Sequence, residues 1–137
     1  MFGTKNSGAA KNAIDTLIGI NTKIEGDVTF CGGLRVDGEV RGNIRCEEGQ
    51  QGTLVISEKA TVEGEVRVGH VVVNGTIIGP VSASESLELL SAAHVTGDVE
   101  YQQIEIQQGA VIEGRLVHLP GAKNVELKLA SNSGLAD

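Results

Sequence analysis

Aliphatic residues in this chain alternate with polar or small residues, and the alternation returns as one motif six times. Each copy has a small residue, an aliphatic residue two positions on, a glycine two further on, and a second aliphatic two beyond that. An apolar residue at every second position is typical of a β-strand and excludes a helix over this stretch. The six copies begin at Thr22, Gly38, Ala60, Gly75, Ala93 and Ala110.

A second motif, aliphatic-x-aliphatic, lies between the copies of the first. The combined repeat of about 17 residues is too short for a helix pair or a propeller blade, but it can hold three short strands. It therefore predicts an all-β, single-domain fold, a triangular parallel β-helix of about six coils, spaced roughly 4.8 Å apart. The second motif occurs at Leu34/Val36, Leu54/Ile56, Val71/Val73, Leu87/Leu89, Ile104/Ile106 and Val125/Leu127.

The glycine that recurs within the first motif indicates a sharp corner with close approach of neighbouring backbones, which glycine alone permits easily. We expect the β-helix to occupy residues 20–130, between a flexible tail at 1–19 and a disordered tail at 131–137. Longer intervals predict loop insertions at residues 46–53 and 118–124, both of which contain turn-forming glycine.

The middle residues of the second motif are expected to point outward. They change along the rod from basic through apolar to acidic, and two valines among them could form a small strip for lateral contact. The favoured interpretation is that the face is simply mixed, as most protein surfaces are. In chain order these residues are Arg35, Val55, Val72, Glu88, Glu105 and Glu126.

Composition supports a narrow core and limits the partners. The chain has no Trp, one Tyr and two Phe, and a thin coil filled by Val, Ile and Leu does not need aromatic bulk. The net charge of −7 would repel phosphate backbones, so we expect no nucleic-acid partner.

No catalytic arrangement stands out along the sequence, so we expect no enzyme activity, cofactor or metal site. Neither GxxxxGK[ST] nor GxGxxG occurs, so the familiar nucleotide-binding loops are not indicated. We interpret His70, His94 and His118 as exposed corner residues. Since we see no secretion signal, Cys31 and Cys46 are expected to be reduced thiols, with a disulfide as the less favoured alternative.

The first residues permit two interpretations. Their apolar part is broken by Lys11 and Asp15, so it is too short to span a bilayer. The segment is either a flexible tail or an interfacial anchor, in which Met1 and Phe2 enter the lipid surface beside Lys5. One such anchor is weak, but many along a polymer would bind firmly.

Units such as Ile24-Glu-Gly-Asp-Val28 and Val95-Thr-Gly-Asp-Val99, with the start Met-Phe-Gly-x-Lys, resemble those of the bactofilins, bacterial cytoskeletal proteins. The resemblance implies a right-handed β-helix that polymerises end to end, without nucleotide, into non-polar filaments. It also implies a cytoplasmic protein peripherally associated with the inner face of the cytoplasmic membrane. There it would act as a scaffold for cell-wall-modifying enzymes or membrane proteins and influence cell shape.

The ends of the predicted rod are candidate polymer contacts because an uncapped β-helix exposes strand edges and an apolar cross-section. We expect Ile24, Val28 and Phe30 at one end and Val125, Leu127 and Leu129 at the other. Bactofilins often have an aromatic residue near the C-terminal contact, whereas this chain has only leucines there.

The alternative function is that of a hexapeptide-repeat acyltransferase on a left-handed β-helix. Gly26, Gly32 and Gly38 do recur at intervals of six, but the pattern then fails. That class of enzyme also uses a catalytic histidine, and no feature of the sequence around His94 supports such a role.

Overall fold

The computed structural model describes residues 14–47 and 52–120, which form fifteen β-strands and no helix. Most strands have three residues, and three longer ones turn a corner of the coil. The strands are β1 (Thr16–Ile18), β2 (Lys23–Glu25), β3 (Val28–Phe30), β4 (Gly32–Val36), β5 (Glu39–Arg41), β6 (Ile44–Cys46), β7 (Gly52–Ile56), β8 (Thr61–Glu63), β9 (Val66–Val73), β10 (Thr76–Ile78), β11 (Val81–Leu89), β12 (His94–Thr96), β13 (Val99–Ile106), β14 (Val111–Glu113) and β15 (Leu116–His118).

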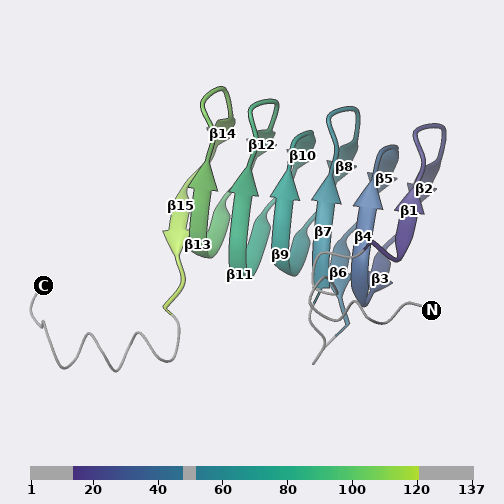
Figure 1. Cartoon of the computed structure of the whole chain (residues 1–137), viewed down its shortest axis with the longest axis horizontal. Coiled ribbons are helices and arrows are strands. Elements are labelled where there is room, and N and C mark those ends of the chain that lie inside the picture. The colour runs from purple at the N-terminus through teal and green to yellow at the C-terminus, as the bar shows by residue number, and fades with distance from the viewer. Residues whose placement is uncertain (1–13, 48–51, 121–137) are drawn as a thin grey trace, which may run out of the picture.

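The strands stack in chain order along the long axis of the molecule, so the first and last coils lie at its two ends (Figure 1). All pairings are parallel, and they define three faces. Face 1 comprises β1, β4, β7 and the C-terminal parts of β9, β11 and β13. Face 2 is the six-stranded sheet of β2, β5, β8, β10, β12 and β14. Face 3 comprises β3, β6, the N-terminal parts of β9, β11 and β13, and β15.

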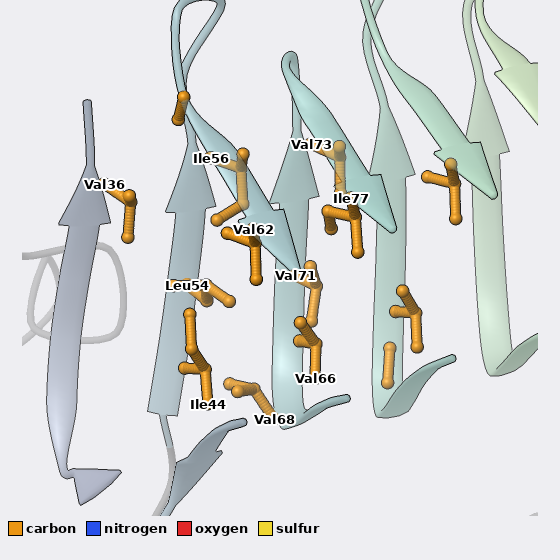
Figure 2. Close-up of a cluster of buried hydrophobic side chains, with 14 of the residues drawn as sticks. Val36, Ile44, Leu54, Ile56, Val62, Val66, Val68, Val71, Val73 and Ile77 are labelled. Atoms are coloured by element: carbon orange, nitrogen blue, oxygen red, sulfur yellow. The ribbon is translucent and has the colours of Figure 1, made fainter. Parts of the chain in front are cut away.

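The core consists of aliphatic side chains stacked in columns, one from each coil. In face 2, Val62 pairs in register with Ile77, and both side chains are fully buried. Figure 2 shows these two side chains pointing into the same interior as Ile56 and Val73 of face 1. Stacking of like residues explains why a repeat of short strands suffices: each coil is covered by its neighbours, and no aromatic layer is required.

The motif glycines form the corner between faces 2 and 3. All six have positive φ angles between 134° and 157°. From Gly42 onward, a Cβ on each glycine would overlap the carbonyl group of the glycine one coil earlier. The column is therefore glycine for two reasons, backbone conformation and the lack of space. Its members are Gly26, Gly42, Gly64, Gly79, Gly97 and Gly114.

The prediction of an all-β parallel solenoid of about six coils is confirmed. One element lies outside the expected limits: β1 pairs with β4, placing Ile18 beside Val36, so the first coil begins before residue 20. The three histidines lie in strands: His94 begins β12, His118 ends β15, and His70 lies where β9 turns from face 3 to face 1. Cys31 and Cys46 are not joined by a disulfide.

Candidate assembly surfaces

The C-terminal end of the described rod exposes aliphatic side chains that are buried in every inner coil. In face 3, Val66, Val81 and Val99 are at most 1% exposed, whereas Leu116, next in the same column, is 47% exposed. In face 1, the column ends with Ile106, which is also 47% exposed. In the inner coils, these side chains are covered by the coil that follows. The last described coil therefore presents an apolar surface that a further coil would cover.

The backbone hydrogen bonds at this end lead to the same conclusion. Within the rod, the N–H of each corner glycine donates to a carbonyl in the following coil, as from Gly64 to Ile78 and from Gly97 to Glu113. Among the described residues Gly114 is the last of this column, and no strand lies beyond it to accept its N–H. An added strand could therefore extend the ladder here.

The N-terminal end is formed by β1, β2 and β3. Ile24, Val28 and Phe30 are half-buried and pack against the core. Gly26 lies at this end of the glycine column, and it alone among the corner glycines has open space where a Cβ would be. The N-terminal coil thus presents apolar side chains and a backbone that a neighbour could approach closely.

Near each end of the described rod, charged side chains pair with an oppositely charged side chain at the same end. Lys23 Nζ lies 3.4 Å from Glu25 Oε2 in β2. At the other end, the backbone N–H of Arg115 donates to Asp98 Oδ1 over 3.0 Å, and its guanidinium lies 3.4 Å from Oδ2. These hydrogen bonds hold the pKa of the Asp98 carboxyl below its usual value. Local pairing limits the repulsion that a net acidic chain would otherwise bring to an end contact.

Only one group of the residues expected at polymer contacts can be placed. Ile24, Val28 and Phe30 lie together in the first coil, and their role as polymer contacts stays a prediction. Val125, Leu127 and Leu129, and the expected membrane-binding residues Met1, Phe2 and Lys5, lie outside the described residues. The last described coil also exposes four aliphatic residues that are not among the expected contacts, of which Ile106 and Leu116 occupy motif positions: Ile106, Val111, Leu116 and Val117.

The described residues offer little for metal or acid–base chemistry. No group of three or more His, Cys, Asp or Glu side chains among residues 14–47 and 52–120 is placed to hold a metal ion. His70 Nδ1 lies 2.8 Å from Ser86 Oγ, and its Nε2 lies 3.6 Å from Glu85. His94 lies 3.7 Å from Glu113 across neighbouring strands of face 2. Separately, the same residues contain no helix that could cross a lipid bilayer.

These features define a parallel β-solenoid whose described ends present uncovered strands and aliphatic side chains. A family model named Bactofilin, described as polymer-forming cytoskeletal, matches residues 16–117. The chain belongs to this bactofilin family of cytoskeletal, polymer-forming proteins. The family is a structural one, which does not favour the acyltransferase alternative.

Two curated relatives come from Myxococcus xanthus (strain DK1622). The chain is 29% identical to bactofilin BacP over 116 residues, which are 85% of this chain and 47% of BacP. It is 28% identical to bactofilin BacO over 102 residues, 74% of this chain and 78% of BacO. The chain thus spans about half the length of BacP. No solved structure matches the chain significantly.

Proposed function

We propose that this protein polymerises end to end, without nucleotide, into non-polar filaments. In such a filament each end of a subunit contacts the same end of the next subunit. The observation that supports this most directly is the column in face 3, where exposure rises from 0% at Val99 to 47% at Leu116. Apolar surface gains about 25 cal/mol for each Å² removed from water, and a stacked copy would remove it. A two-fold contact needs only one self-complementary surface at each end.

Assembly without nucleotide follows from the absence of a phosphate-binding sequence motif and from the nature of the ends. Stacking needs only apolar burial and extension of the strand ladder, neither of which requires a bound phosphate. We therefore expect the same amount of polymer in the presence and absence of ATP or GTP.

The cellular role follows from the same proposal. The filament would lie on the inner face of the cytoplasmic membrane, held by the N-terminal residues Met1, Phe2 and Lys5 of many subunits. As a polymer of identical rods it would offer regularly spaced sites to cell-wall-modifying enzymes or membrane proteins. It would thus act as a scaffold that influences cell shape.

Sedimentation of the full chain in nucleotide-free buffer tests the end contact. Leu116→Lys should shift most of the protein from the pellet to the supernatant, because a charge would be buried between stacked coils. Ile78→Lys is the matched control: Ile78 is 45% exposed, close to the 47% of Leu116, but it lies in an inner coil on face 2. Equal pelleting of both variants, with unchanged circular dichroism, would contradict end-to-end assembly.

A further inference from the structure

Face 1 carries one row of outward-pointing residues that runs unbroken through all its strands. Strand register places Leu17 beside Arg35, Arg35 beside Val55, Val55 beside Val72, and so on through the acidic residues Glu88 and Glu105. Leu17 is 58% exposed, and the valines at the centre are half-buried. The row therefore has an apolar centre with a positive residue on one side and a negative residue on the other.

We propose that face 1 is a lateral contact between two antiparallel copies of this chain, related by a two-fold axis that runs parallel to the strands between β7 and β9. Such an axis places Val55 of one copy on Val72 of the other. It also brings Arg35 opposite Glu88 at both edges of the centre. The four central residues are thus complementary to themselves in charge and apolar character, while the outermost pair brings Leu17 opposite Glu105.

The charge order discriminates against the parallel arrangement. Two copies aligned in the same direction would bring Arg35 onto Arg35 and Glu88 onto Glu88, and like charges in contact disfavour that pairing. Arg35 remains able to bind across the interface, since its 3.0 Å bond to Asp37 uses Nε and leaves the terminal nitrogens as further donors. In the neighbouring row, Gly33 and Thr53 are buried, whereas His70 and Ser86, which continue the row, are partly exposed.

The contact is small, so it depends on the polymer. Six strands and four residues of each give a face of roughly 29 by 13 Å, or about 400 Å². A stable complex buries about 800 Å² on each partner. A single pair of subunits would therefore associate weakly, whereas two filaments would be joined by many such contacts at once. To this extent the inference rests on the proposed end-to-end polymer.

Zero-length cross-linking of the full chain tests the arrangement. Arg35→Lys places an amine at position 35, and a carbodiimide should join it to Glu88 of another copy. Within one chain the two positions are three strand spacings apart, roughly 14 Å, which is beyond the reach of a direct amide link. Asp37 supplies a within-chain link as the internal standard. Mass spectrometry that finds the 35–37 link at high protein concentration without the 35–88 link would overturn the proposal.

Charge reversal gives a second test by negative-stain microscopy of filament width. Arg35→Glu alone and Glu88→Arg alone should each yield single filaments, because like charges then face each other. An equal mixture of the two variants should restore paired filaments. Arg45→Glu is the matched control, since Arg45 is exposed on face 3, and it should leave pairing intact.

The outcomes separate this inference from the proposed function. Filaments that form without the 35–88 link, or that stay unpaired in the wild type, overturn the lateral contact alone. The 35–88 link without filaments overturns end-to-end polymerisation alone. If the mixture of charge variants fails to pair while the wild type pairs, the contact uses another face or another partner, and the proposal is wrong.

Discussion

The carbonyl oxygen of Gly42 lies where a Cβ on Gly64 would have to be placed, one coil further along the rod. Gly64 also has a φ angle of 149°, which side chains disfavour. Gly64→Ala should therefore lower the free energy of unfolding by about 3 kcal/mol or more, combining backbone strain with overlap. Urea unfolding followed by circular dichroism measures this loss.

Gly26→Ala separates strain from overlap. Gly26 has a comparable φ of 134°, but no heavy atom lies within 4 Å of the added Cβ. Gly26→Ala should therefore lower the free energy of unfolding by about 1–3 kcal/mol, from backbone strain alone. If Gly26→Ala and Gly64→Ala lose equal stability, close stacking of the corners is not what requires glycine.

Ile77 and Ile78 are neighbours in β10 that face opposite sides of the sheet. Ile77 is fully buried, whereas Ile78 is 45% exposed. Truncating the buried side chain should cost about 2–5 kcal/mol, because a cavity is left between coils. Ile78→Ala should change the unfolding free energy by no more than about 0.5 kcal/mol. A similar cost for both variants in thermal or urea unfolding would contradict the register of this strand.

Asp37 should make stability depend on acid pH. The Ser57 hydroxyl and the Arg35 guanidinium donate to its carboxylate and hold the pKa of that carboxyl below its usual value of 3.8. The carboxylate therefore stabilises the fold above pH 3.8, and this contribution is lost as the pH falls through the lower folded value. Asp37→Asn should cost about 1–2 kcal/mol at pH 7.

The difference between Asp37→Asn and wild type should shrink below pH 3.8, as the native carboxyl takes up its proton. Urea unfolding at pH 7 and in acid measures it. Glu58→Gln, at an exposed turn position, is the control, and its free energy of unfolding should equal that of the wild type at both pH values. A constant difference across this range would show that the charge of Asp37 does not stabilise the fold.

Membrane binding should depend on the first residues and on polymerisation together. Phe2→Ala should release filaments from vesicles containing anionic phospholipid, because each side chain contributes about 2 kcal/mol of apolar burial. Phe2→Leu should retain binding. Leu116→Lys, which blocks stacking, should also release the protein although its N-terminus is unchanged. Flotation with vesicles separates bound protein from free filaments, and equal flotation of the wild type and the three variants would contradict a multivalent N-terminal anchor.

The coil could be predicted from sequence because every inner coil places the same structural requirements on the residues of the motif. A motif glycine is fixed by a corner that recurs in each coil, and a residue such as Val62 is fixed by the aliphatics stacked on both sides. These requirements are local and periodic, so they leave a readable pattern.

The ends could not be predicted as well, because the pattern weakens where stacking stops. In β1 only Ile18 is buried, while Leu17 points outward, so the strand has no aliphatic-x-aliphatic signature. Leu116 and Ile106 occupy motif positions that are buried in the inner coils, so the motif alone does not mark them as exposed. Exposure depends on whether another coil follows, which no single copy of the motif encodes.

Fibre diffraction from oriented filaments of the full chain tests the central claim most directly. If the rods stack end to end, the strands lie across the filament and hydrogen bonds run along it. The reflection at about 4.8 Å should then lie along the filament axis. Discrete particles in place of filaments, or a reflection of this spacing perpendicular to the axis, would contradict the account.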